Sequence, residues 1–381
     1  MESLTWTTGI GHVRAINDHQ QIVGDYRVVT LQLGPGNAPP VANVGGPYSA
    51  PEGSDVIFDL SATDRDGGQV YGKVDFGDGT DDYVDIMVPA TWRRQEHVYA
   101  DNGTYTLTLI VIDDKGARDT ATTTVTIANV APTILAGSLT GPSAPIPLTG
   151  GSASAPVSFE FRDPASQKDV YEAEVACGNG VVLRSMNIPV SSTIINDVYV
   201  GKGTYAGTCT YTAPGVYTVR ASVSDEDGGT SAPAYYRSVI VYDPAGGSAM
   251  GSGFFTEDGQ HTAKTHFTFS AKFGSGASLP NGSVRVWGGP LDFQSTTIEM
   301  LVAAGNWAQF WGTGTLNGAA AHFRITAVEN ASTGREKRAD AIRIELWNAA
   351  GTTLLYDTQP GAAEDAPVTT AVDGGTIRVR R

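Results

Sequence analysis

Residues 55–60 read DVIFDL, and in this stretch Val56, Phe58 and Leu60 alternate with side chains that fall on the opposite face of an extended chain. Alternation with a period of two puts every second side chain on one face of a β-strand. Four further runs are rich in β-branched and aromatic residues, namely 104–112, 122–127, 216–223 and 235–242. These runs therefore predict strands.

Turn-forming pairs separate these runs. Asn-Gly and Asp-Gly tolerate the positive φ angles that tight hairpins require. They occur at 66–67, 78–79, 102–103, 179–180, 227–228, 281–282 and 317–318. No stretch shows a helical period over three turns with capping residues. The pattern predicts an all-β fold of tandem β-sandwiches, with a sandwich or jelly-roll-like module at the C-terminal end.

The charge of the chain limits its partners. Its 381 residues contain 40 acids and 25 bases, a net charge of −15, and residues 37–129 alone hold 15 of the acids and 6 of the bases. This excess argues against nucleic acid or an anionic membrane as a partner, because both would be repelled. No run of 18 apolar residues occurs, so we expect no membrane insertion.

Residues 37–42, NAPPVA, return as NVAPTI at 129–134. Between these two points the chain contains DFGDG (75–79), HVY (97–99), GTYTL (103–107) and VIDDKG (111–116). The second copy has ACGNG (176–180), TY (210–211), GVYTV (215–219) and VSDEDG (223–228). The repeat indicates two homologous units of about 100 residues each.

These motifs resemble the PKD (polycystic-kidney-disease-type) domain, an extracellular, seven-strand, immunoglobulin-like sandwich. The resemblance covers about 200 residues and is weaker in the second copy, where GNG replaces GDG. It predicts one PKD-like domain at 37–129 and another at 130–243. An N-terminal segment, 1–36, and a C-terminal β domain, 244–381, complete the predicted organisation.

A calcium site is predicted in the first unit. Asp64 and Asp66 are one residue apart on a turn, so both can point at one ion. The PKD resemblance implies a metal set of Asn37, Asp64, Asp66 and Asp113, supplemented by Asp114 and backbone carbonyls. An all-oxygen set suits Ca²⁺ rather than Zn²⁺. The alternative is that these acids only cap turns at a solvated surface.

The second unit retains Asn129, Asp163 and Asp225, but Ala165 replaces the second acid of the turn. We therefore expect a weaker site there.

The cysteines, Cys177 and Cys209, both lie in the second unit. In a PKD-like sandwich their two strands are neighbours, so the resemblance implies a disulfide, which suits an extracellular module. The alternatives are two buried thiols in a reducing compartment or a metal pair. The metal pair lacks further Cys or nearby His ligands to complete four.

Residues 246–253 read as a Gly/Ser linker, and strands resume after it. Segments 291–295, 312–318, 342–347, 355–357 and 374–377 are similar to the post-COAP-type module found at the C-terminus of bacterial cell-surface proteins. Trp307, Gln309 and Trp311 alternate onto one strand face, with Trp287 and Phe293 near them in sequence. This set predicts a glycan-binding platform, whereas the alternative is that these rings cover a core.

Residues 13–24 are similar to one HAF-type extracellular repeat, with Gln20 in place of the usual Gly. A single repeat cannot bury its own face, so we expect its strand to pack on the first sandwich or on another subunit.

Known catalytic motifs are absent, including G-x-S-x-G, H-E-x-x-H and the P-loop, so we predict no enzyme. The favoured function is a structural or adhesive module of a secreted or cell-surface bacterial protein, stiffened by Ca²⁺. Its partners would be cell-surface or matrix proteins, or polysaccharide. The alternatives are a carbohydrate-binding accessory region of a larger extracellular enzyme and a filament subunit that self-assembles through residues 1–36.

Overall fold

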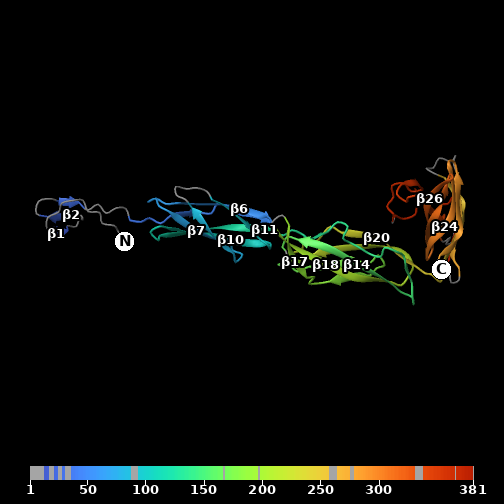
Figure 1. Ribbon diagram of the computed structural model, residues 1–381, viewed down its shortest axis with the longest axis horizontal. Helices are drawn as coiled ribbons and strands as arrows, with labels where there is room; N and C mark the ends of the chain where they lie inside the picture. The colour runs from blue at the N-terminus through green and yellow to red at the C-terminus, as the bar shows by residue number, and fades with distance from the viewer. Residues whose placement is uncertain are drawn as a thin grey trace.

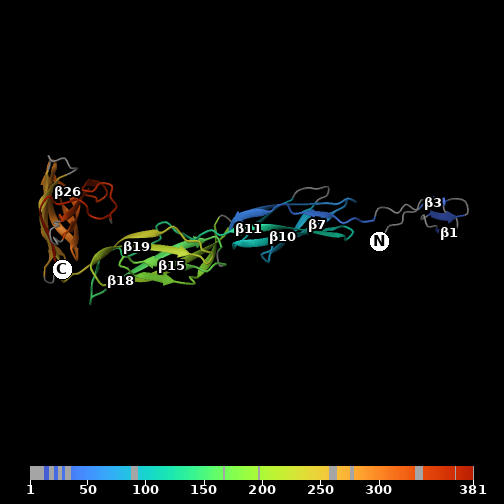
Figure 2. The ribbon, with the colours of Figure 1, turned by 180° about the vertical axis from the view of Figure 1, so that it is seen from behind.

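The computed structural model describes residues 13–16, 21–24, 28–30, 36–86, 93–165, 168–195, 198–256, 264–274, 279–330, 338–364 and 366–380. Every regular element in these residues is a β-strand, which confirms the predicted all-β fold. Within this part of the chain, no helix is long and apolar enough to span a membrane. The sheets follow one another along the molecule, from β1 at one end to β24 and β26 at the other (Figures 1 and 2).

The first sandwich packs a sheet of three strands against a sheet of five. The smaller sheet has the order β4 (Val41–Asn43), β6 (Asp55–Thr63), β9 (Arg93–Val98). The larger has the order β5 (Tyr48–Pro51), β11 (Arg118–Ala128), β10 (Gly103–Asp113), β7 (Val70–Asp75), β8 (Asp81–Ile86). As the alternation predicts, Phe58 and Leu60 are fully buried, where they meet Leu107, Leu109 and other residues of the opposite sheet.

The second sandwich repeats this plan. One sheet has the order β12 (Thr133–Ile134), β14 (Ala153–Asp163), β18 (Val198–Tyr211), β17 (Val190–Ile195). The other has the order β13 (Ile146–Pro147), β20 (Ala234–Tyr242), β19 (Gly215–Ser224), β15 (Glu172–Ala176), β16 (Val182–Ser185). The two copies also share a tyrosine: Tyr99 donates to the Phe76 carbonyl at 2.9 Å, and Tyr211 donates to the Cys177 carbonyl at 2.9 Å.

The C-terminal unit is one antiparallel sheet of nine strands with the order β28-β27-β26-β25-β24-β23-β22-β21-β29. In chain order these are β21 (Ser248–Thr256), β22 (Lys264–Phe273), β23 (Pro280–Gly288), β24 (Leu291–Ala304), β25 (Trp307–Leu316), β26 (Ala319–Val328), β27 (Ala341–Asn348), β28 (Leu354–Asp357) and β29 (Gly374–Arg380). The sheet curls round a single core, so that β29 also contacts β24 and β26.

The predicted Gly/Ser linker at 246–253 is wrong for most of its length, because residues 248–253 belong to β21. Glycine is required there by close packing. A Cβ on Gly251 would lie 2.7 Å from the Phe269 ring, and one on Gly253 would lie 2.3 Å from the Gly374 carbonyl oxygen. These glycines let neighbouring strands approach each other.

The N-terminal strands β1 (Val13–Ile16), β2 (Gln21–Gly24) and β3 (Val28–Thr30) pair with one another in a three-stranded antiparallel sheet. No described strand of the first sandwich joins this sheet. The predicted packing of the HAF-like segment on the first sandwich therefore does not occur through strand pairing, and self-assembly through residues 1–36 stays a prediction.

Candidate metal centre

The predicted calcium set of the first sandwich lies at the end of the sandwich where β4 begins. Asn37 Nδ2 donates to Asp113 Oδ2 at 2.9 Å, and the Ala38 amide donates to Asp66 Oδ2 at 2.6 Å. Asp64 Oδ1 accepts the Asp66 amide at 3.0 Å, whereas Asp64 Oδ2 is buried without a partner. The fold thus brings all four residues to one place. Whether they bind an ion stays a prediction.

Asp113 is already well satisfied by protein groups. Burial opposes its charge, but hydrogen bonds from Asn37 and from the amides of Ala117 and Lys115 outweigh burial, so the pKa of Asp113 lies below its usual value. Among the described residues, carboxylates gather within 4.8 Å in two groups of three, and Asp64, Asp66 and Asp113 belong to neither.

The same scaffold exists at the corresponding end of the second sandwich, where it meets the first. Asn129 Nδ2 donates to Asp225 Oδ1 at 3.1 Å, which matches the pair of Asn37 and Asp113. The Ala165 amide donates to Asp163 Oδ1 at 2.8 Å, as the Asp66 amide does to Asp64. Only the second acid of the turn is missing, as the sequence indicates.

Glu52 of the first sandwich supplies a carboxylate at that place. In the first sandwich Asp66 accepts the amide that follows Asn37, whereas in the second sandwich Glu52 Oε1 accepts the amide of Val130, which follows Asn129, at 2.8 Å. Ala165 removes one carboxylate from the second sandwich, which is why a weaker site was expected there. Glu52 of the neighbouring domain supplies a carboxylate in its place.

The turn that carries Glu52 is bonded to the first sandwich and packs closely against the second. The Glu52 amide donates to the Ala128 carbonyl at 3.0 Å, and the Gly53 amide donates to the Tyr99 carbonyl at 2.9 Å. Gly53 has a φ of 69°, and a Cβ there would lie 2.4 Å from Pro164 Cβ. Glycine is thus required both by the backbone conformation and by the close approach of the second domain.

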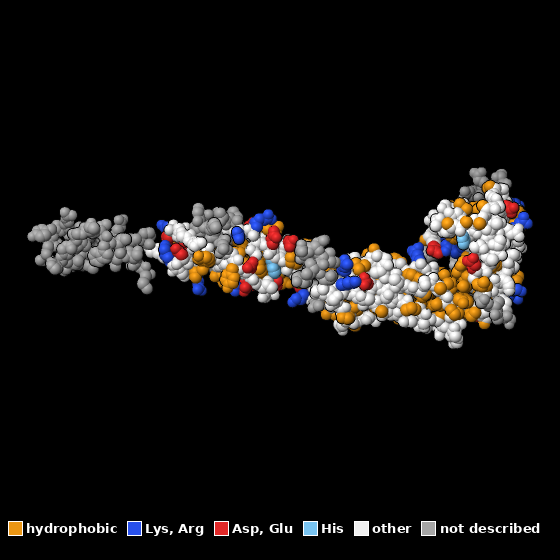
Figure 3. All heavy atoms as spheres, viewed as in Figure 1, with side chains coloured by type: hydrophobic (Ala, Val, Ile, Leu, Met, Phe, Trp, Pro, Cys, Tyr) orange, Lys and Arg blue, Asp and Glu red, His pale blue; other side chains and the backbone are white. Residues whose placement is uncertain are grey.

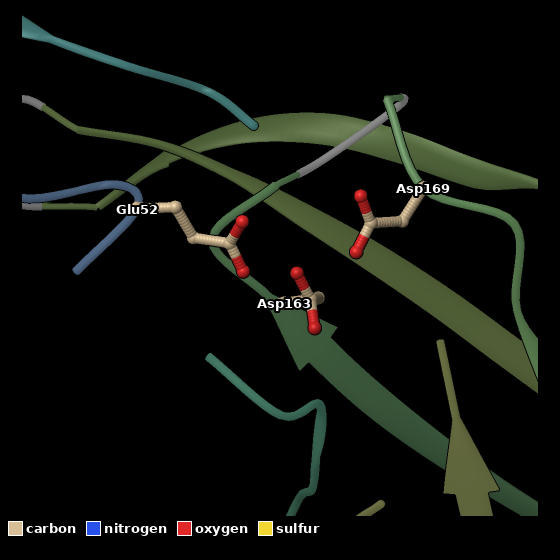
Figure 4. A group of neighbouring side chains, drawn as sticks. All are labelled: Glu52, Asp163 and Asp169. Carbon is tan, nitrogen blue, oxygen red and sulfur yellow. The ribbon is translucent and has the colours of Figure 1, made fainter. Parts of the chain in front are cut away.

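Three buried carboxylates meet at this junction. Oxygens of Glu52, Asp163 and Asp169 lie within 4.8 Å of one another, and the three residues are 2%, 0% and 7% exposed (Figure 4). Asp169 also groups with Asp101 and Asp227. The cluster therefore draws residues from two turns of the first sandwich and, in the second, from the end of β14 and from two loops.

Much of the acceptor capacity at the junction is unused. Buried oxygens without a hydrogen-bond partner are Glu52 Oε2, Asn129 Oδ1, Asp163 Oδ2, both carboxylate oxygens of Asp169, and Asp225 Oδ2. A buried, unpartnered charge is costly unless a proton or a cation neutralises it. All of these atoms are oxygens, so the chemistry of the donor set fits a hard divalent cation.

The pKa values of the three carboxyl groups reflect the same burial without neutralising partners. Burial, reinforced by the charge of Asp163, raises the pKa of Glu52 to about 7 despite the hydrogen bond from Val130. Burial and the charges of Asp163 and Glu52 raise the pKa of Asp169 to about 8. Burial also raises the pKa of Asp163 to about 6, against the hydrogen bonds from Ala165 and Tyr171.

Sequence reasoning identified Asn129, Asp163 and Asp225 but missed Glu52, Asp169, Asp101 and Asp227. No local signal marks these four, because Glu52 precedes Asp163 by more than a hundred residues and reaches it only when the domains pack.

The predicted disulfide is confirmed. Cys177 and Cys209 are bonded, with Cα atoms 5.7 Å apart. Cys177 follows β15 in one sheet and Cys209 lies on β18 in the other, so the bond joins the two sheets across the core rather than two strands within one sheet.

The predicted glycan platform lies on β25. Trp307 and Trp311 are partly exposed and Gln309 is 9% exposed, on the face opposite the buried Phe310. Phe293 does not join them, because it is fully buried in the core of the C-terminal unit. Trp287 lies on β23 and is 37% exposed.

Comparison with known proteins identifies one part of the chain. Residues 37–127 match the family model described as the PKD domain. Collagenase ColA of Bacillus cereus (strain ATCC 14579) is 33% identical over 88 residues, and Collagenase ColQ1 of Bacillus cereus (strain Q1) is 36% identical over 92 residues. These matches cover 23% and 24% of this chain and only 8% and 9% of the two collagenases.

Two solved structures align over most of the chain. A protocadherin γB4 extracellular domain is 11% identical with a TM-score of 0.26, over 84% of this chain and 66% of that chain. A structure of a 1.5-MDa bacterial ice-binding adhesin is 12% identical with a TM-score of 0.23, over 82% of this chain and 98% of that chain. Neither score is high enough to argue from. The family match, by contrast, coincides with the first sandwich, so a PKD domain occupies residues 37–127.

Proposed function

We propose that the chain is a non-catalytic extracellular module that spaces or attaches a larger protein, and that Ca²⁺ bound between its first two sandwiches makes it stiff. The observation that carries this proposal is the group of buried carboxylates from Glu52, Asp163 and Asp169, whose oxygens lack partners and come from two domains. An ion at this place is attracted to both domains at once.

Calcium is the cation that this chemistry favours. Ca²⁺ takes six to eight oxygen ligands in flexible geometry, from carboxylates, amide oxygens and water. Mg²⁺ requires a tight octahedron, and Zn²⁺ favours His and Cys, which the cluster lacks. Glu52, Asp163, Asp169, Asp225 and the Asn129 amide would hold the ion. We extend the proposal to Asn37, Asp64, Asp66 and Asp113, whose acids are better satisfied by the protein itself.

The disulfide supports an extracellular location, since such bonds persist in oxidising compartments. Extracellular calcium modules bind at about 10⁻⁴–10⁻³ M, in the range of the calcium outside cells. The proposed partners are cell-surface or matrix proteins, or polysaccharide.

Titration calorimetry of the calcium-depleted full chain tests the metal centre. We expect wild type to bind Ca²⁺ and Glu52→Gln to lose the junction site, because the amide keeps the hydrogen bond from Val130 but removes one charge. Glu96→Gln is the matched control, since Glu96 is an exposed acid on β9 of the same domain. Equal calcium binding by wild type and Glu52→Gln would show that the junction is not the site.

A further inference from the structure

A cleft lies at the other end of the second sandwich, where this sandwich meets the outer face of the C-terminal sheet. Two hollows of about 290 and 490 Å³ share Ser238, Gln309 and Glu364, and they therefore form one elongated cleft. The space-filling view is hollowed at this place, and hydrophobic side chains gather beside it (Figure 3). The volume is in the range of known ligand sites.

Three indole rings line the cleft. Trp307 and Trp311 come from β25, Trp347 comes from β27, which is separated from β25 by β26, and each is partly exposed. The guanidinium of Arg324 lies 5.2 Å from the centre of the Trp347 ring. Partly exposed tryptophans around one hollow offer several flat apolar surfaces to a ligand.

Planar polar side chains stand between these rings. Gln309 is nearly buried, and its Nε2 donates to Thr326 Oγ1 at 3.0 Å, which fixes the orientation of its amide. Arg324 is paired with Glu345 at 2.8 Å and also with Glu364. Arg343, only 4% exposed at its side chain, is paired with Asp357 at 2.8 Å.

The balance of charges in the cleft determines which charge on a ligand the cleft favours. Three arginines, Arg237, Arg324 and Arg343, stand at the cleft against three carboxylates, Glu345, Glu364 and Asp357, so the cleft has no net positive charge. A phosphate, sulfate or uronate would therefore gain no net attraction from the charges of the cleft. A neutral ligand with many hydroxyl groups meets fixed donors and acceptors instead.

We propose that this cleft binds a neutral polysaccharide chain. A pyranose ring has a face of C–H groups that stacks on an indole ring, and a rim of hydroxyls that bond to planar amide, guanidinium and carboxylate groups. The cleft presents both features along its length and is bounded by two domains. The inference rests on the proposed function, whose partners include polysaccharide, and deepens it by naming the site and the class of ligand; no cleft residue belongs to the candidate metal centre.

The test is affinity electrophoresis of the full chain through gels containing mixed-linkage β-glucan, xylan, galactomannan or, as an anionic comparison, pectin. We expect at least one neutral polysaccharide to retard wild type, and Trp311→Ala and Trp347→Ala to weaken binding at least tenfold. Trp287→Ala is the control, because Trp287 is exposed on the same sheet, stacks on His266 at 5.5 Å and lies outside the cleft. Retardation should persist in EDTA, which separates this site from the metal centre.

A wild-type measurement covers the case in which an alanine variant fails to fold. With 5-fluorotryptophan in all six tryptophans, added polysaccharide should shift resonances that Trp311→Phe and Trp347→Phe assign to the cleft. The proposal is wrong if no neutral polysaccharide binds, if only pectin binds, if an extended peptide alone occupies the cleft, or if Trp287 carries the binding.

Discussion

Glu52 belongs to the first sandwich, but its carboxylate occupies, at the scaffold of the second sandwich, the position that Asp66 occupies in the first. Its Oε1 accepts the Val130 amide, and its Oε2 has no partner although the side chain is buried. A buried acceptor without a partner costs about 1–3 kcal/mol, and more when it is charged. At the scale of single residues, the metal-free junction is therefore unfavourable for folding, and the proposed cation would relieve it.

This cost predicts an unusual pH dependence in EDTA. The folded pKa values of Glu52 and Asp169, about 7 and 8, lie above those of an unfolded chain, so the folded state binds more protons between about pH 5 and 8. The associated stability is present at low pH and is lost as the pH rises through these values. Asp101, Asp163, Asp225 and Glu226 face the same group and add to the repulsion.

We therefore expect the melting temperature of metal-free protein to fall from pH 5 to pH 8, and Ca²⁺ to remove most of that fall. Glu52→Gln should flatten the dependence in EDTA, whereas Glu96→Gln should not. Calorimetric scans across this pH range provide the check. A melting temperature that rises steadily to pH 8 in EDTA would contradict the account.

At the scale of elements, the turn from β5 to β6 determines whether the junction can form. Gly53 combines a positive φ with a 2.4 Å approach to Pro164, so Gly53→Ala should strain this turn and displace Glu52. We expect calcium binding at the junction to weaken at least tenfold. Gly79→Ala is the matched control, because Gly79 has a φ of 93° but open space around its Cβ position. Equal calcium affinities of the two variants would mean that the turn does not position the site.

The disulfide is a second feature that acts at the scale of elements. It joins the two sheets of the second sandwich and closes a loop with a sequence separation of 32 residues. In the chain-entropy model such a loop contributes roughly 3–4 kcal/mol. Denatured, unreduced protein should show no free thiol. In urea unfolding, a Cys177→Ala/Cys209→Ala variant should have a free energy of unfolding that is lower by about this amount, and so a lower midpoint. Two titratable thiols in protein from an oxidising compartment would refute the bond.

The strands could be predicted because their signals are local: alternation in β6 and Asn-Gly or Asp-Gly turns depend on neighbours in the sequence. The junction could not, because Glu52 and Asp169 meet only through the packing of two domains. Gly251 and Gly253 misled the sequence reading for a related reason. Glycine that serves close strand packing looks, in sequence, like glycine that serves flexibility.

At the scale of the whole molecule, the units lie in a row, and the candidate metal centre and the cleft lie at the two ends of the second sandwich (Figure 1). An ion that is bound by both the first and second sandwich penalises bending between them. We expect a rod whose joint between the two sandwiches is stiff with calcium and loose without it, while saccharide binding at the cleft is independent of the ion.

The most direct test of the central claim is the distance distribution between spin labels on the first two sandwiches. Tyr83→Cys and Met186→Cys suit this purpose, because both positions are exposed and both native cysteines are bonded. A calcium-stiffened joint predicts a narrow distribution of distances in Ca²⁺ and a broad one in EDTA for wild type. Glu52→Gln should give a broad distribution under both conditions, and Glu96→Gln should behave like wild type. Identical distributions for wild type with and without calcium would contradict this prediction.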